Sequence, residues 1–102
     1  MKAAIPLFGK RISPRFDCAQ SFVLVTILDQ SVTSRQNQSI EDSMPFVKAQ
    51  RLKDLNVDTL ICNGVDEGTL ESLKSLGIRV LSDIRGEVDE VIDLYIGGKL
   101  DN

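Results

Sequence analysis

The stretch Val57-Asp-Thr-Leu-Ile-Cys-Asn-Gly64 decides the fold. Its first six residues are mostly apolar or β-branched, which predicts a buried strand, and Asn63-Gly64 is a turn signal that ends it. Apolar residues recur at helical spacing both before and after this stretch. A strand between two helices is typical of a crossover unit, so the stretch predicts parallel strand pairing in an α/β domain.

Three strands are expected upstream of this unit. Ala3 to Phe8 is a short apolar run, and Ser21 to Leu28 is rich in β-branched and aromatic residues, the strongest strand signal in the chain. Val32 to Asn37 alternates weakly and predicts a polar edge strand. Between them, Gly9 to Ala19 is expected to be a loop, and the polar segment Gln36 to Ser43 is expected to be a mobile loop.

The helices have recognisable boundaries. Ser43 is expected to cap the first helix, with Pro45 in its first turn and Asn56 at its end. Asp66 is expected to cap the second helix, which Gly77 ends before a short strand from Ile78 to Leu81. The third helix is predicted by five apolar residues on one face: Val88, Val91, Ile92, Tyr95 and Ile96.

The resulting order is β-β-β-α-β-α-β-α in one domain over residues 1–102. If the fourth strand lies parallel beside the first, these elements form a five-stranded mixed sheet in the order 3-2-1-4-5, with flanking helices. The chain then changes direction between strands one and four, and ligands of open α/β sheets bind at such a switch point. The predicted crevice is lined by Phe8-Gly-Lys-Arg11 on one side and Cys62-Asn-Gly64 on the other.

Composition excludes several classes of function. The 102 residues include 12 Lys+Arg, 15 Asp+Glu and no His, so the net charge is −3 and His-based catalysis or metal ligation is excluded. An acidic chain is a poor non-specific partner for nucleic acid. The longest apolar stretch, Phe22 to Leu28, is too short to cross a membrane. Two cysteines do not make a disulfide scaffold, and the chain is expected to be cytoplasmic.

Several short motifs carry a resemblance to a known family. They are Lys2-Ala-Ala-Ile-Pro6, Ser13-Pro-Arg-Phe16 followed by Ala19-x-x-Phe22, Val57 to Gly64, Leu70-x-x-Leu-Lys-x-x-Gly-Ile78 and Ile96-Gly-Gly-Lys-Leu100. In these residues the chain resembles the dinitrogenase iron–molybdenum cofactor biosynthesis family. The resemblance implies a ribonuclease-H-like fold. It also implies a protein that carries or holds metal–sulfur clusters, such as nitrogenase cofactor precursors or a molybdenum–copper sulfide cluster, often without catalysis.

The chain departs from the family pattern near the expected site. Many members have His where this chain has Arg15, and Gly where it has Asp17. The Gly-Gly that follows the fourth strand in the family is Asn63-Gly64 here. A cluster is therefore not held through histidine in this chain.

The candidate site is a basic loop that faces a turn. Lys10, Arg11 and Arg15 lie close to Gly9 and Ser13, and an anion is held well by such cations together with backbone amides. The loop is expected to face Asn63 and Gly64, with Gly64 allowing close approach of the backbone to the cargo. The alternative is a solvated basic turn that binds nothing.

The two thiols are the candidate metal ligands. Cys62 and Cys18 could bind a soft metal as thiolates. The alternative for Cys62 is a small apolar residue of the core.

The leading hypothesis is a non-catalytic carrier of an anionic metal–sulfur cluster or cofactor precursor, bound non-covalently, with cofactor-assembly proteins as partners. The alternative is a regulatory or protein-interaction module of the same fold that has lost cluster binding and holds no cofactor. A phosphate-ligand enzyme is a weaker third hypothesis. A nuclease is excluded because Ala3 to Phe8 contains no carboxylate, and no phosphate-binding NTPase or dinucleotide motif is present. The oligomeric state stays open.

Overall fold

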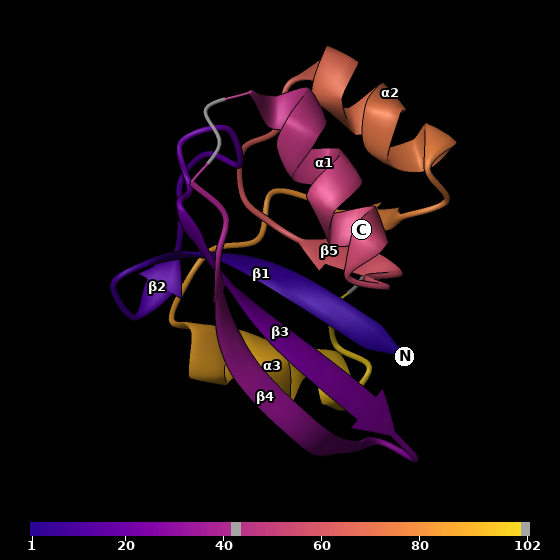
Figure 1. Cartoon of the computed structure of the whole chain (residues 1–102). Coiled ribbons are helices and arrows are strands. Elements are labelled where there is room, and N and C mark those ends of the chain that lie inside the picture. The colour runs from indigo at the N-terminus through magenta and orange to yellow at the C-terminus, as the bar shows by residue number, and fades with distance from the viewer. Residues whose placement is uncertain (42–43, 101–102) are drawn as a thin grey trace.

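Strand β1 (Lys2–Phe8) lies at the centre of a mixed sheet in the computed structural model, which describes residues 1–41 and 44–100 (Figure 1). β3 (Ser21–Leu28) pairs with it antiparallel and β5 (Thr59–Ile61) pairs with it parallel. β4 (Ser31–Ser39) and β6 (Arg79–Leu81) are the edges, so the order is β4-β3-β1-β5-β6. This confirms the predicted order and the predicted switch point between β1 and β5.

A sixth strand corrects the expected loop between Gly9 and Ala19. β2 (Arg11–Ile12) pairs antiparallel with the end of β1, with Phe8 opposite Arg11. Gly9 has a φ of +64°, the left-handed conformation that glycine adopts without strain, and this allows the tight two-residue turn. A two-residue strand is too short to show periodicity, which is why the sequence did not reveal it.

The polar edge strand is longer than expected. β4 continues to Ser39, which pairs with Ser21, so the prediction of a mobile loop from Gln36 was wrong over Gln36–Ser39. Polar residues are tolerated here because β4 is exposed on nearly its whole length, while β3 supplies the hydrogen-bonding partner. Asp29 and Gln30, with φ of 52° and 63°, form the tight turn between the two strands.

The three helices follow the predicted boundaries closely. α1 (Pro45–Asp54) begins after Met44; the expected cap, Ser43, lies outside the described residues. Asn56, with a φ of 64°, follows the end of this helix as predicted. The remaining two helices are α2 (Glu67–Ser75) and α3 (Val88–Ile96).

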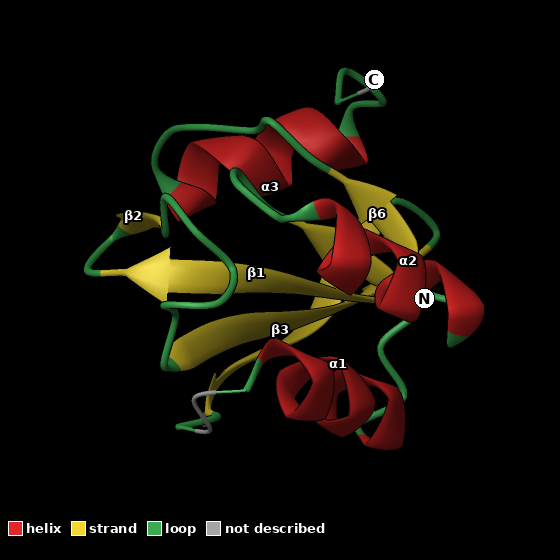
Figure 2. Ribbon diagram, turned by 90° about the horizontal axis from the view of Figure 1, so that it is seen from above, coloured by secondary structure: helices red, strands yellow, loops and turns green. Residues whose placement is uncertain are grey.

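The sheet lies between α3 on one face and α1 and α2 on the other (Figure 2), and each face has its own apolar layer. Alternate residues of each central strand point to opposite faces. Ala4, Leu24 and Leu60 face the layer under α1 and α2, while Ile5, Val25 and Ile61 face the layer under α3. The described residues form one α/β domain, and the predicted ribonuclease-H-like relationship stays a prediction. Within the described ranges, no helix is long and apolar enough to span a membrane.

Candidate functional site

The loop that follows β2 meets the turn that follows β5, as the switch-point argument predicted. The backbones of Arg15 and Gly64 form a parallel bridge. The Phe16 N–H donates to the Gly64 carbonyl oxygen at 2.8 Å, and the Gly64 N–H donates to the Pro14 carbonyl oxygen at 2.9 Å. Two segments about fifty residues apart in the sequence are thereby fixed against each other.

Gly64 has a different role from the expected one. A Cβ atom at this position would lie 2.7 Å from the Pro14 carbonyl oxygen, a distance that real Cβ contacts do not reach. Only glycine therefore lets the two backbones meet. Because the Gly64 N–H already donates to Pro14, it is not available to a bound anion, and the close approach that glycine allows is to the loop itself.

The loop is held from its other side by a buried lysine that the sequence analysis missed. Lys48 of α1 is almost fully buried, and its Nζ donates to the Asp17 carbonyl oxygen at 2.6 Å. Phe16 inserts into the core beside Phe22. The available signal was helical spacing, because Lys48 lies four residues before the buried Leu52 and therefore on the same face of α1.

A small pocket opens where these segments meet. Its volume is about 200 Å³, and Arg15, Asp17, Gly64, Asp66 and Thr69 contribute to its lining. Arg15 donates to both carboxylate oxygens of Asp17, at 3.0 and 2.6 Å. This hydrogen-bonded carboxylate raises the pKa of Arg15. The pocket thus contains a guanidinium that an acidic neighbour already occupies.

The start of α2 forms the opposite wall of the pocket. The Asp66 side chain accepts a hydrogen bond from the Thr69 N–H at 2.7 Å, which confirms the predicted N-cap. That bond stabilises the carboxylate and lowers the pKa of Asp66. The Thr69 amide is therefore satisfied by the protein itself.

The remaining members of the predicted basic loop lie elsewhere. Lys10 and Arg11 belong to the turn and strand β2, and neither lines the pocket. Their backbones meet the start of α3: Val88 N–H donates to the Lys10 carbonyl oxygen, and Arg11 bridges Glu87. The predicted basic loop therefore does not face the pocket as a whole: of its three cations Arg15 lines the pocket, while the backbones of Lys10 and Arg11 lie beside the start of α3.

The other predicted residues near the pocket have structural contacts. Gly9 occupies the exposed turn before β2, away from the pocket lining. Ser13 is buried, and its hydroxyl donates to the Arg15 carbonyl oxygen at 3.0 Å, which shapes the loop. The Asn63 carbonyl oxygen accepts from the Asp83 N–H. Ser13 and Asn63 therefore support the loops, and neither lines the pocket.

The two thiols are not equivalent. Cys62 is completely buried in the apolar layer with Phe16 and Leu60, and this burial, with Asp83 nearby, raises its pKa to about 12. Such a thiol stays protonated at neutral pH and is a poor metal ligand. Cys18 is exposed on the loop that carries Arg15. Among residues 1–41 and 44–100, no three His, Cys, Asp or Glu side chains converge into a metal-binding group.

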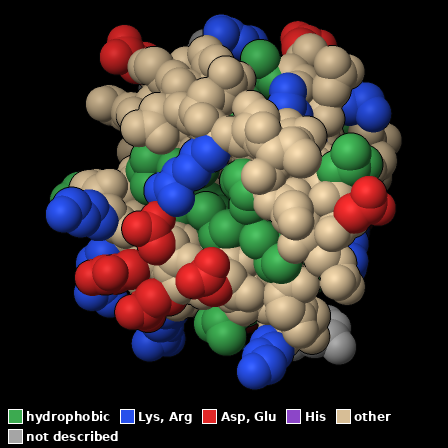
Figure 3. Space-filling view, turned by 90° about the horizontal axis from the view of Figure 1, so that it is seen from below, with side chains coloured by type: hydrophobic (Ala, Val, Ile, Leu, Met, Phe, Trp, Pro, Cys, Tyr) green, Lys and Arg blue, Asp and Glu red, His purple; other side chains and the backbone are tan. Residues whose placement is uncertain are grey.

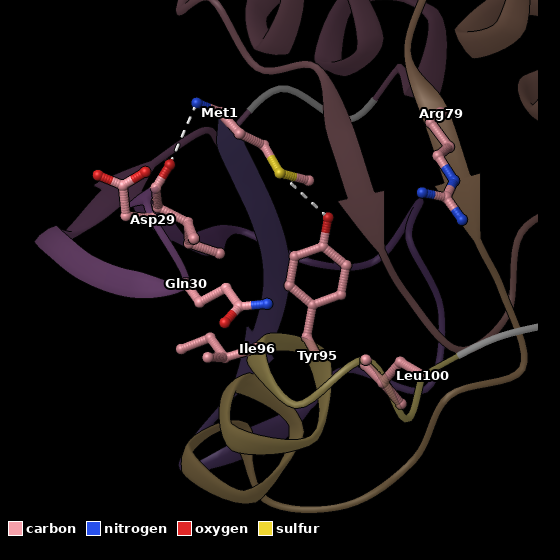
Figure 4. A pocket seen from close by; sticks show the side chains of 9 residues that line it. Met1, Asp29, Gln30, Arg79, Tyr95, Ile96 and Leu100 are labelled. Carbon is pink, nitrogen blue, oxygen red and sulfur yellow. Dashed lines mark hydrogen bonds between the residues drawn. The ribbon is translucent and has the colours of Figure 1, made fainter.

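A larger cavity of about 480 Å³ lies at the opposite end of the sheet, where β1 and β6 begin (Figure 4). Met1, Gln30, Arg79 and Tyr95 contribute to it, and in Figure 4 the Tyr95 ring stands between Gln30 and Arg79. The Tyr95 hydroxyl donates to the Met1 sulfur at 3.4 Å. Ligands of open α/β sheets bind at the carboxyl ends of the strands, so this cavity is not the first candidate.

The surface that includes α3 is acidic in part. Figure 3 shows acidic side chains gathered on one area of this surface. Asp89 and Glu90 lie in the first turn of α3, and Asp89 pairs with Arg35 of β4 at 2.7 Å. An anion is repelled by such a cluster of carboxylates, so this part of the α3 surface is not a candidate site for one.

The fold and the pocket define a class: small mixed α/β domains with a pocket at the switch point of the sheet. The model of the family described as "Dinitrogenase iron-molybdenum cofactor" matches residues 1–98. The chain therefore belongs to this family.

Relatives of known sequence or structure span nearly the whole chain. The uncharacterized protein MJ0580 of Methanocaldococcus jannaschii is 26% identical over 106 residues, covering 99% of this chain and 90% of that protein. The crystal structure of PH0822 has a TM-score of 0.94 and 27% identity, covering 99% of this chain and 93% of the other. The apo form of the orange protein from Desulfovibrio gigas, at 21% identity, has a TM-score of 0.80 over 98% of this chain and 90% of its own, and shares the fold.

Proposed function

We propose that the chain is a non-catalytic carrier that holds an anionic metal–sulfur cluster, or a precursor of an iron–molybdenum cofactor, as cargo in the pocket beside Arg15. One observation carries the proposal: the loop with Arg15 and the turn with Gly64 form a pocket at the switch point of a family member. The carrier is expected in the cytoplasm, with cofactor-assembly proteins as partners.

The donor set favours binding by charge and hydrogen bonds over direct ligation. Cys62 is protonated and buried, and Cys18 offers a single exposed thiol. Thiometallates are anions, and a planar guanidinium can donate two parallel hydrogen bonds to them. Arg15 is the group in the pocket with this chemistry.

The cargo has to compete with Asp17 for the guanidinium. The Arg15 side chain is 66% exposed and the Asp17 side chain is 29% exposed, so their pair is a surface ion pair. Such pairs contribute little stability, since water already solvates both charges. A cargo with several negative atoms can therefore take the place of Asp17 on Arg15 at little cost.

The test is an oxygen-free titration of the full chain with tetrathiomolybdate, followed by visible absorption and by amide NMR shifts. We expect saturable binding of one anion per chain, with shifted amides in the Arg15 loop and at the start of α2. Arg15→Gln should weaken binding roughly tenfold, because a charge-assisted hydrogen bond is lost. Arg79→Gln, which removes an exposed arginine at the other end of the sheet, should leave the affinity unchanged.

The second candidate is a regulatory or protein-interaction module of the same family without cargo. The Arg15–Asp17 pair and the buried Cys62 favour it, because both remove groups that a cluster site uses. The titration distinguishes the two candidates. If binding is not saturable, or if the wild type and Arg15→Gln have equal affinities, the carrier function is contradicted and the interaction module is favoured.

A further inference from the structure

The helices α1 and α2 lie side by side (Figure 1). Residues of both helices line an apolar groove on the surface next to the candidate pocket. Two side chains dominate it: Phe46, which is 65% exposed, and Met44, which is 57% exposed. Large apolar side chains that gather on a surface indicate a site of interaction. Methionine adapts its shape to different partners, and an exposed aromatic ring is a typical anchor.

The groove runs along both helices. Phe46 and Gly68, from the starts of α1 and α2, line one cavity of about 350 Å³. Gln50 and Ser75, from later turns of the same helices, line the next cavity of about 560 Å³. On the α2 side the lining residues run from the N-cap Asp66 to Leu76, which at about 1.5 Å per residue gives a groove of about 15 Å, the length of nearly three helical turns. An amphipathic helix with apolar residues at i, i+3, i+4 and i+7 fits such a groove.

The groove is continuous with the pocket that contains Arg15. Asp66 and Thr69 line both that pocket and the first cavity of the groove. Met44, Phe46 and Ser72 line both cavities of the groove. A partner that occupies the groove therefore ends beside the pocket, where cargo would be exchanged.

The charge of the groove specifies the partner. Among the described residues that line its two cavities, the charged ones are Asp66 and Glu71, both acidic. An acidic border favours a basic partner, since complementary charge speeds association and selects its orientation. We propose that the groove between α1 and α2 binds a basic amphipathic helix of a protein that delivers or receives the cargo. The cargo part of this inference rests on the proposed function.

The test uses synthetic helices of about 14 residues, each about 21 Å long. One has leucines at i, i+3, i+4 and i+7 spacing with lysines elsewhere, and its counterpart has glutamates in place of the lysines. We expect the lysine peptide to bind and to shift amides of α1 and α2, and the glutamate peptide to bind far more weakly. Phe46→Ser should weaken binding roughly tenfold or more. Phe8→Ser, which removes a similarly exposed phenylalanine of β1, is the matched control and should leave the affinity for the lysine peptide unchanged.

A charge reversal tests the specificity. Glu71→Lys should weaken binding of the lysine peptide and strengthen binding of the glutamate peptide. The inference is overturned if both peptides bind equally, if the shifts lie on α3, or if the free chain forms a dimer that Phe46→Ser abolishes. The last outcome would assign the groove to a second copy of the chain.

The two proposals fail separately. Phe46→Ser should leave the tetrathiomolybdate affinity unchanged, because Phe46 does not line the pocket that contains Arg15. If the peptide binds while tetrathiomolybdate does not, the docking surface stands and the carrier function is contradicted. If tetrathiomolybdate binds while the lysine peptide does not, the carrier function stands and the docking surface is contradicted.

Discussion

At the scale of single residues, Cys62 shows how burial changes chemistry. It directly follows β5, and its thiol lies in the apolar layer with no exposed surface. Burial disfavours the thiolate, so its pKa is raised from 9.0 to about 12. The folded chain therefore keeps this proton at a pH where the unfolded chain loses it.

This difference makes stability depend on pH. Between about pH 9 and about pH 12, the folded state binds up to one more proton at Cys62 than the unfolded state, so rising pH lowers the free energy of unfolding. Between about pH 8 and about pH 10, we expect this proton to lower the free energy of unfolding of the wild type by about 1 kcal/mol. The Cys62→Ala variant should lack this part of the decrease. Urea unfolding at both pH values measures the change in the free energy of unfolding. Cys18→Ala is the control and should show the same change as the wild type. If the free energy of unfolding of Cys62→Ala fell with pH as steeply as that of the wild type, the thiol would not be buried.

Residues such as Arg15 and Gly64 show what can be predicted from a sequence. Their approach was predicted, because topology alone brings the end of β1 near the end of β5. The hydrogen-bond partners of these two residues were not predicted. The Asp17 carboxylate accepts from the Arg15 guanidinium, and the Pro14 carbonyl oxygen accepts from the Gly64 N–H. Such short contacts depend on the path of a loop, for which periodicity carries no signal.

At the scale of elements, Lys48 joins α1 to the loop that carries Arg15. Its ammonium donates to the Asp17 carbonyl oxygen, and its stem is packed in the interior. We expect Lys48→Met to lower the free energy of unfolding by about 1 to 3 kcal/mol, because the part-buried Asp17 carbonyl loses its charged hydrogen-bond donor. Hydrogen exchange at the Phe16 amide should also become faster, since the loop is released from α1.

The control for this prediction lies on the same helix. Lys53 is exposed near the end of α1, and Lys53→Met should change neither the stability nor the exchange of Phe16 appreciably. If the Lys48 and Lys53 variants behaved alike, the loop would not depend on α1. The lysine escaped sequence analysis because a charged residue on a helix is normally assigned to the exposed face.

The strands were predicted with uneven success for a physical reason. β3 and the stripe of α3 are buried, so their apolar patterns are strong, and both were predicted with the correct ends. β4 is exposed and β2 has two residues, so neither leaves an apolar pattern that marks its ends. Hydrogen bonds to β3 and to β1 specify these two strands, and a single sequence does not display such pairing.

At the scale of the whole molecule, the acidic side chains of α3 and the groove between α1 and α2 lie on opposite faces of the sheet. The α3 side has acidic side chains, and Arg15 lies by the pocket at the start of α2. The net charge of −3 hides this arrangement. An anionic cargo and a basic partner helix would therefore meet different, adjacent surfaces of one small domain, the pocket and the groove.

The affinity of tetrathiomolybdate for Asp17→Asn tests the central claim most directly. If the anion takes the place of Asp17 on Arg15, removing that negative charge should strengthen binding roughly threefold or more. Asp93→Asn, which removes an exposed charge from α3, should leave the affinity unchanged. Binding by Asp17→Asn that is equal to or weaker than that of the wild type would contradict the account, because the carboxylate would then not compete with the cargo for Arg15.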